Sequence, residues 1–243
     1  MENRFESLQL LVSGAAHEMR TPLGVCQSSL SVVTERLEKT EQKFLEKSLS
    51  EEDALQAFRL NKRYLKIIEQ NLKKAMDLTD QLKEFAFIDS DWVDQEVSES
   101  VASAIRPFQE ELSGNDINVK VNIEQSPLSV NLPKATLEQI VSNFIKNSLM
   151  YGFAESSSGN ITIDIDRGAS WLSLVYTDDG CGIDDDIRPY IFEPFFTTGR
   201  NKGGAGLGLS IVYAIVVKSI AGSIELDTDH RTGCRFIVTL PLF

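Results

Sequence analysis

The chain has 243 residues, of which 42% are hydrophobic and 25% are charged. This balance is typical of a folded globular protein and excludes a disordered or collagen-like chain. The formal net charge of −12 disfavours binding to nucleic acid or to an anionic membrane, because both require clustered lysine and arginine side chains.

The cysteines and the apolar runs indicate a cellular compartment. No apolar run reaches the roughly 18 residues of a membrane span, and the polar N-terminus lacks the features of a secretory signal. The chain has an odd number of cysteines without metal-type spacing: Cys26, Cys181 and Cys234. This makes a disulfide framework unfavourable and favours a reducing compartment. We therefore expect a cytoplasmic location, without membrane contact by this fragment.

Glycine, proline and charge are distributed unevenly along the chain. Only two of the 15 glycines precede residue 114, and only one of the seven prolines precedes residue 107. Residues 1–90 contain 13 basic and 15 acidic side chains, whereas residues 91–243 contain 11 and 21. The sequence therefore predicts two unlike domains, 1–90 and 91–243.

Residues 4–86 are almost free of helix breakers, and their apolar side chains recur at helical spacing. The second half carries a heptad seam interrupted by Asn61, and the first half carries a looser one. A turn at residues 47–53, with Ser50 as the N-cap of the second helix, separates the two halves. We expect an antiparallel helical hairpin that dimerises into a four-helix bundle, because two helices alone cannot bury two apolar stripes.

His17 lies off the apolar seam of the first predicted helix and should face solvent. A lone exposed histidine is most often ordinary surface, but its neighbours favour chemistry. Glu18 follows directly, Thr21 lies one turn further on the same face, and Pro22 removes a backbone donor. A carboxylate that accepts a hydrogen bond from one imidazole nitrogen leaves the other nitrogen nucleophilic.

The segment 16–23, AHEMRTPL, closely resembles the H-box of sensor histidine kinases. This resemblance implies that His17 is the residue that accepts a phosphoryl group and that Glu18 is its acid/base partner. It also implies that Thr21 is used when the same domain removes phosphate from its response regulator.

Beyond residue 88 the pattern changes to short alternating stretches. These predict strands at 117–123, 161–165, 172–176, 223–226 and 236–240. Helical patterns lie near 97–112, 135–149 and 207–220. The second domain is therefore predicted to be an α/β sandwich, an antiparallel or mixed sheet with helices on one face, and the whole chain an α plus α/β protein.

Two carboxamides border the apolar face of the predicted helix 135–149. Asn143 and Asn147 lie one turn apart, and buried carboxamides need hydrogen-bond partners. Nearby backbone groups can supply these partners. The alternative is a Mg²⁺ ion, which prefers oxygen ligands and keeps substrate phosphates in its shell.

Two glycine-rich segments follow. Residues 177–183, TDDGCGI, read most simply as a turn, but a carboxylate beside glycines can also bind an exocyclic amine of a flat ring. Residues 203–209, GGAGLGL, precede a predicted helix and can bind phosphate through backbone N–H groups. The glycines match neither a P-loop nor a dinucleotide-binding motif. Between them, residues 191–198, IFEPFFTT, form either core or the hinge of a lid.

These four blocks, in this order, resemble the N, G1, F and G2 boxes of the histidine-kinase ATP-binding domain, a Bergerat-type fold shared with gyrase, Hsp90 and MutL ATPases. The resemblance implies that Asn147, helped by Asn143, coordinates Mg²⁺ and that Asp178 binds the adenine amino group. The other residues that it implies for the ATP site are Tyr151 and Gly182 against the nucleotide, Gly204, Gly206 and Gly208 in the lid, and Gly180, Ile183, Phe196, Thr197, Thr198, Lys202 and Leu207.

Two positions depart from the pattern of the family. Met150 stands where a basic residue is common, so one phosphate contact is expected to be absent unless Lys202 or Arg200 replaces it. Asp179 stands where asparagine is common and adds negative charge. We expect this charge to weaken ATP binding slightly unless it is solvated.

The favoured function is ATP-dependent autophosphorylation of His17, followed by transfer of the phosphoryl group to an aspartate of a response regulator, with phosphatase activity toward that regulator as a further property. The expected partners are ATP with Mg²⁺, the regulator and a second copy of the chain. Two alternatives remain open: a nucleotide-driven conformational module that modifies no histidine, and a degenerate or mainly phosphatase-acting core. The cytoplasmic location also fits the cytoplasmic part of a larger membrane-bound sensor.

Overall fold

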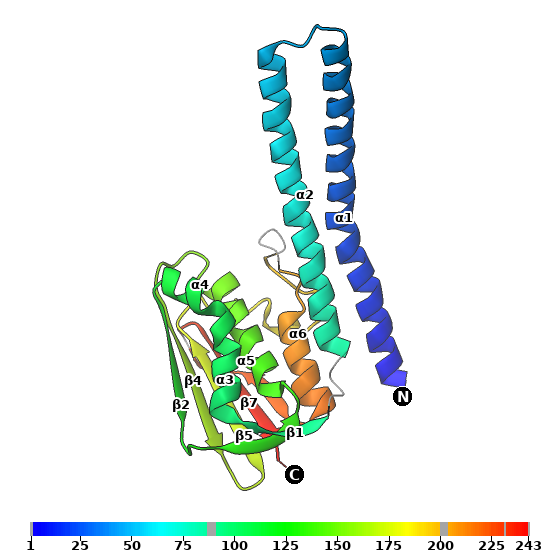
Figure 1. Cartoon of the computed structure of the whole chain (residues 1–243). Helices are drawn as coiled ribbons and strands as arrows, with labels where there is room; N and C mark the ends of the chain where they lie inside the picture. The colour runs from blue at the N-terminus through cyan, green and yellow to red at the C-terminus, as the bar shows by residue number, and fades with distance from the viewer. Residues whose placement is uncertain (1, 87–90, 200–203, 231, 243) are drawn as a thin grey trace. The chain divides into compact units, whose positions relative to one another are not determined.

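The computed structural model describes residues 2–86, 91–199, 204–230 and 232–242 (Figure 1). The chain divides into two compact units, residues 1–82 and 83–243. The first is helical and the second is built around a sheet. In the described part of the chain, no helix combines the length and the apolar character needed to cross a membrane.

The first unit is an antiparallel helical hairpin, as predicted, made of α1 (Glu2–Leu45) and α2 (Glu51–Ala86). Ser50 caps α2, because its hydroxyl accepts a hydrogen bond from the backbone N–H of Asp53 at 3.0 Å. Lys43 at the end of α1 donates to the Asp53 carboxylate at 3.1 Å. The Lys43 ammonium and the Ser50 hydroxyl lower the pKa of the Asp53 carboxyl below its ordinary value.

Buried side chains recur on both helices at heptad spacing. On α1 they are Ala15, Pro22, Ser29 and Val33, and on α2 they are Asn61, Ala75 and Leu78. The thiol of Cys26 donates to the carbonyl of Ile68 at 3.5 Å and so joins the two helices. Asn61 is only 8% exposed, and its Oδ1 has no hydrogen-bond partner among the described residues.

A second set of apolar side chains on the same helices stays exposed. Leu23, Leu30, Leu37 and Phe44 follow one another at seven-residue intervals on α1, and Phe58, Leu65 and Leu72 do so on α2. Phe58 is 70% exposed and Leu65 is 54% exposed. We call these seven residues the exposed heptad stripe. The single hairpin therefore buries only part of its heptad pattern.

The second unit contains a five-stranded sheet with the strand order β2-β4-β5-β7-β6. Its strands are β2 (Ile117–Ile123), β4 (Gly159–Arg167), β5 (Trp171–Asp178), β6 (Ser223–Leu226) and β7 (Cys234–Pro241). β2 runs parallel to β4, and the other neighbours are antiparallel. The predicted mixed sheet is therefore confirmed.

Helices cover one face of this sheet (Figure 1). They are α3 (Val97–Ile105), α4 (Gln109–Gly114), α5 (Thr136–Asn147) and α6 (Gly208–Tyr213). The core forms where alternate strand residues meet the apolar side of α5: Phe144 lies 5.0 Å from Tyr176 and 4.9 Å from Phe236, measured between ring centroids. α5 and α6 each continue into a π-helical turn, Ser148–Gly152 and Ala214–Ser219.

Two features differ from the sequence prediction. The helix expected at 97–112 is divided by a 3₁₀ turn at Arg106–Phe108, because Pro107 cannot donate the backbone hydrogen bond that a continuous helix needs. In addition, β1 (Trp92–Glu96) and β3 (Ser129–Pro133) form a small antiparallel sheet that was not predicted. Their pairing joins residues far apart in the chain, which local periodicity does not reveal.

Candidate functional site

The carboxylate of Asp178, at the end of β5, accepts three hydrogen bonds. It is 3% exposed. Its Oδ1 accepts hydrogen bonds from the backbone N–H groups of Gly180 at 3.0 Å and Cys234 at 3.1 Å. Its Oδ2 accepts one from the hydroxyl of Ser148 at 2.6 Å. Burial and three hydrogen-bond donors, two backbone N–H groups and one hydroxyl, therefore hold this carboxylate in one orientation.

Glycines allow backbone to pack closely around Asp178. A Cβ atom on Gly180 would lie 2.7 Å from the Cα of Gly152. A Cβ on Gly233, which has a φ of +74°, would collide with the backbone of Asp178 itself. Gly182 in turn lies against the carbonyl of Gly233. Gly180 and Gly182 were predicted for this site, whereas Gly152 and Gly233 were not.

Asn143 and Asn147 come together with Gly208, the first residue of α6. A Cβ on Gly208 would lie 3.1 Å from Oδ1 of Asn143 and 3.3 Å from Oδ1 of Asn147. The amide nitrogen of Asn143 donates to the carbonyl of Gln139 at 2.8 Å. The amide nitrogen of Asn147 is buried and has no hydrogen-bond partner among the described residues. Two amide oxygens thus converge on one point beside Gly208, and amide oxygens are ligands that fit Mg²⁺.

Tyr151, in the π-helical turn that follows α5, contacts the predicted lid. Its hydroxyl lies 2.7 Å from Oγ1 of Thr197, which also accepts the backbone N–H of Gly199 at 3.0 Å. The N–H of Gly204 donates to the carbonyl of Gly199 at 3.2 Å. A Cβ on Gly204 would collide with the Tyr151 hydroxyl, so a larger residue at this position would displace that hydroxyl. Lys202 and Arg200 lie outside the described residues.

The remaining residues predicted for the ATP site differ in their contacts and in their exposure. The N–H of Phe195 donates to the carbonyl of Gly206 at 2.8 Å. This bond links the segment 191–198 to the second glycine-rich segment. Phe196 packs against Tyr190 with ring centroids 5.8 Å apart. Leu207 is fully buried, Thr198 is exposed, and Ile183 is half-buried.

The two departures from the family pattern have clear positions. Met150 faces the lid, since a Cβ on Gly204 would lie 3.2 Å from its sulfur. The Asp179 carboxylate is exposed and accepts from both the backbone N–H of Asn160, at 2.7 Å, and its side-chain amide, at 2.8 Å. The negative charge of Asp179 is therefore solvated and hydrogen-bonded to β4.

The π-helical turn Ser148–Gly152 links the separate parts of this site. Ser148 binds Asp178, Tyr151 binds Thr197, and the carbonyl of Gly152 accepts the backbone N–H of Cys181 at 3.0 Å. The turn directly follows Asn147, whose side chain lies beside Gly208. One short segment thus brings together three motifs that lie far apart in the sequence.

His17 lies in the first unit, on α1. Its side chain is exposed, as predicted, and so is that of Thr21 one turn further on. Glu18 is half-buried. The helix continues through Pro22, which is buried. The imidazole and the Thr21 hydroxyl are therefore both accessible to a partner on one helical surface.

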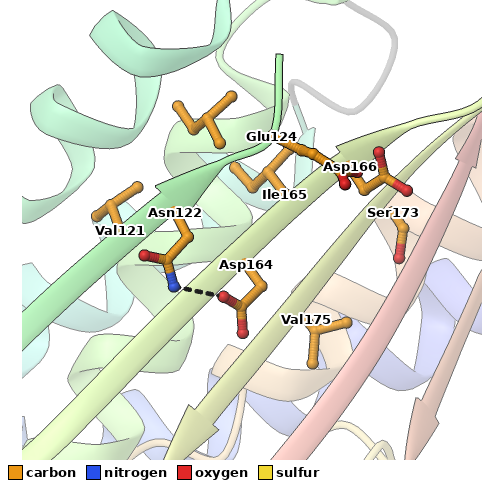
Figure 2. Close-up of a pocket in the computed structure, with 9 residues that line it drawn as sticks. Val121, Asn122, Glu124, Asp164, Ile165, Asp166, Ser173 and Val175 are labelled. Atoms are coloured by element: carbon orange, nitrogen blue, oxygen red, sulfur yellow. Dashed lines mark hydrogen bonds between the residues drawn. The ribbon is translucent and has the colours of Figure 1, made fainter. Parts of the chain in front are cut away.

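A pocket of about 560 Å³ lies elsewhere, over β2, β4 and β5 (Figure 2). Its lining includes Asn122, whose amide donates to Asp164 at 2.6 Å. A hydrogen bond to Asp166, together with the charge of that carboxylate, raises the pKa of the Glu124 carboxyl. None of the residues predicted to bind nucleotide lines this pocket.

Two family models match the chain. Residues 7–91 match the His Kinase A (phospho-acceptor) domain, and residues 133–243 match the histidine kinase-, DNA gyrase B- and HSP90-like ATPase. The sensor histidine kinase CpxA of Escherichia coli is 30% identical over 247 residues, covering 100% of this chain and 49% of CpxA. AtsR of Burkholderia thailandensis, also a sensor histidine kinase, is 27% identical and covers 93% of this chain and 36% of AtsR. The chain thus spans a third to a half of the length of these relatives.

A solved structure of histidine kinase ThkA in complex with response regulator TrrA resembles the whole chain in fold. Its TM-score is 0.64 at 20% identity, and the match covers 100% of this chain and 65% of that one. The two domain matches follow the same order as the helical hairpin and the α/β sandwich. The chain therefore belongs to the sensor histidine kinases of two-component systems, as their catalytic core of a phosphoacceptor domain followed by an ATP-binding domain.

Proposed function

We propose that this chain uses ATP to phosphorylate His17 and then passes the phosphoryl group to an aspartate of a response regulator. The observation that carries the nucleotide part is the buried Asp178 carboxylate, oriented by three hydrogen bonds at the end of β5. Such a group is suited to accept a hydrogen bond from the adenine amino group. The close approach of Gly152 and Gly180 provides backbone against which a flat base can pack.

Asn143 and Asn147 are proposed to hold the Mg²⁺ that accompanies ATP. Their amide oxygens converge beside Gly208. When bound, Mg²⁺ neutralises phosphate charge, which an acidic domain without a lysine cluster needs. The glycine-rich segment 204–208 and Tyr151 are proposed to border the phosphates, with Thr197 fixing the Tyr151 hydroxyl. The proposed roles of Gly182, Ile183, Phe196, Thr198, Lys202 and Leu207 in binding ATP follow from the same motifs.

The chemistry at His17 is proposed to be nucleophilic. An imidazole nitrogen forms a bond to the γ-phosphorus, the bond from that phosphorus to the bridging oxygen breaks, and ADP leaves. The Glu18 carboxylate is proposed to orient the imidazole through its other nitrogen and to take up the proton that is released. The exposure of His17 supports this role, because the same side chain must also reach a regulator.

Transfer to a response regulator is supported by the ThkA structure, which was solved with its regulator TrrA. Thr21 is exposed one helical turn from His17 and is proposed to orient a water molecule when phosphate is removed from the regulator. The three free thiols and the use of ATP support a cytoplasmic location for this part of the protein.

The exposed heptad stripe supports a homodimer. Its leucine and phenylalanine side chains recur every seven residues on both helices and remain exposed in one hairpin. Two hairpins that bury these stripes against each other form a four-helix bundle. We propose that this second copy of the chain covers the stripe.

The test is incubation with γ-labelled ATP and Mg²⁺. We expect label that is lost in acid and retained in base, as for a phosphohistidine, and that is absent in His17→Ala. Label that persists in His17→Ala would contradict the assignment of the acceptor. Absence of label in the unaltered chain, with ATP bound, would instead favour a conformational module or a mainly phosphatase-acting core.

A further inference from the structure

Two buried hydroxyl groups lie beside Asp178, and neither is among the residues predicted to bind the nucleotide. Ser148 is 3% exposed and Tyr176 is 0% exposed. The Ser148 oxygen lies 2.6 Å from Oδ2 of Asp178 and 2.8 Å from the Tyr176 hydroxyl. The three side chains therefore form a continuous hydrogen-bonded chain inside the second unit.

The direction of these hydrogen bonds follows from the chemistry of the groups. An ionised carboxylate only accepts, so Ser148 donates its single proton to Asp178. The Ser148 oxygen must then accept from Tyr176. Burial raises the pKa of the Tyr176 hydroxyl well above its ordinary value, which keeps this hydroxyl protonated and able to donate. The order is therefore Tyr176 to Ser148 to Asp178.

The acceptor positions of the Asp178 carboxylate can be counted. A carboxylate has about four lone-pair positions, two on each oxygen. On Oδ1 both are used, by the backbone N–H groups of Gly180 and Cys234. On Oδ2 one is used, by Ser148. Among the residues that the structure describes, no second donor to Oδ2 is found, so one position on Oδ2 remains for a ligand.

We propose that Ser148, held in place by Tyr176, is a positioning residue that directs the remaining lone pair of Asp178 Oδ2 toward the 6-amino group of the bound purine. This inference rests on the proposed contact between Asp178 and adenine. It adds that the hydrogen bond from Ser148 makes this contact selective for a purine with a 6-amino group. Without the Ser148 hydroxyl, both lone pairs of Oδ2 are open, and the carboxylate is held only through Oδ1.

The experiment compares two nucleotides that differ only in the 6-amino group, ATP and purine riboside triphosphate. Their dissociation constants are measured with the full chain in the presence of Mg²⁺. We expect the unaltered chain to bind ATP about tenfold more tightly, as for one hydrogen bond to a charged group. Ser148→Ala should weaken ATP binding about fivefold to tenfold and leave binding of the analogue within about twofold. Ser148→Thr, which retains the hydroxyl, should keep the preference for ATP.

A second pair of variants separates positioning from stability. Ser148→Ala leaves the buried Tyr176 hydroxyl without its partner and should lower the melting temperature. The double variant Ser148→Ala/Tyr176→Phe removes that orphaned group, so the melting temperature should rise again while the preference for ATP stays lost. Thr136→Val is the matched control, because it removes a buried hydroxyl that donates to Pro133 at 2.6 Å at the other end of α5. It should lower stability without changing the ratio of the two affinities.

The outcomes distinguish the two levels of the inference. If the unaltered chain binds ATP and the analogue equally, the contact between Asp178 and the amino group is wrong, and the role of Ser148 fails with it. If the unaltered chain prefers ATP and Ser148→Ala keeps the full preference, the contact stands and only the positioning role is overturned. If Ser148→Ala does not fold, the affinities for ATP and for the analogue are compared in Tyr176→Phe instead. In this variant we expect the preference for ATP to fall by about twofold to threefold.

Discussion

The backbone N–H of Cys234 donates a hydrogen bond to Oδ1 of Asp178 at 3.1 Å, although 56 residues separate the two in the chain. The bond forms where β5 and β7 pair in register at these two residues. Gly233 precedes Cys234 with a φ of +74° and packs on the Asp178 backbone. The orientation of the proposed adenine-binding carboxylate therefore depends on the last strand of the sheet.

Gly233→Ala should disrupt this arrangement. A Cβ at this position would collide with the Asp178 carbonyl, and the positive φ is unfavourable for alanine. We expect a loss of ATP affinity of more than about tenfold and a free energy of unfolding lowered by more than about 1 kcal/mol. Isothermal titration and denaturant unfolding measure the two effects. Gly114→Ala is the control, because its Cβ would meet no atom within 4 Å, and unchanged binding is expected.

Asp178→Asn should abolish ATP binding while leaving the dimer intact. The amide that replaces one oxygen would face a hydroxyl or backbone donors instead of accepting from them. Nucleotide titration and sedimentation velocity measure the two properties. The control is Asp179→Asn. The Asp179 carboxylate binds Asn160, so this variant should bind ATP normally. Retained ATP affinity in Asp178→Asn would refute the adenine contact.

Thr21→Ala should separate the two activities proposed for the phosphoacceptor helix. His17 and its neighbour Glu18 are unchanged in this variant, so autophosphorylation should proceed at the normal rate. Loss of phosphate from the phosphorylated regulator should slow severalfold, because the exposed hydroxyl no longer orients water. Decay of labelled regulator is followed with and without the kinase core. An unchanged decay rate would remove Thr21 from this role.

Leu65→Asp should dissociate the proposed dimer. Leu65 lies in the exposed heptad stripe, and burying an unpaired carboxylate between two hairpins is strongly unfavourable. Sedimentation equilibrium should show a dissociation constant raised by about a hundredfold or more. Leu55→Asp is the matched control, since Leu55 is also exposed but lies outside the stripe. If both variants remain dimeric, another surface forms the interface.

Cys234 should make stability depend on alkaline pH. Burial raises the pKa of its thiol to about 12. Because the folded pKa lies above the unfolded value, the stabilisation is complete below about pH 8.5 and is lost as the pH rises toward 12. The free-energy difference between the unaltered chain and Cys234→Ala should therefore be constant near pH 7. It should shrink by up to about 1.4 kcal/mol per pH unit above pH 9, as followed by urea unfolding. A difference that stays constant up to pH 10.5 would contradict this.

The hairpin illustrates why some elements could be predicted from the sequence. Helical spacing over residues 4–86 and the Ser50 cap are local signals, so both helices and the turn between them agree with the prediction. Which apolar residues are buried was not predictable in the same way. Phe58 and Ala75 both belong to the heptad seam, yet the first is 70% exposed and the second is 6% exposed in one chain. Spacing identifies an apolar face but not the partner that covers it.

By itself, the sequence determined the elements and motifs whose signals lie within a few residues: the exposed His17 beside Glu18, the paired Asn143 and Asn147, and the acidic turn at Asp178. Only the tertiary structure decided which groups surround that carboxylate. Ser148 reaches it from the end of α5, and Gly233 with Cys234 reaches it from β7. These contacts cross 30 to 56 residues of chain. They arise from strand pairing and core packing, and no local pattern records which distant side chains such packing brings together.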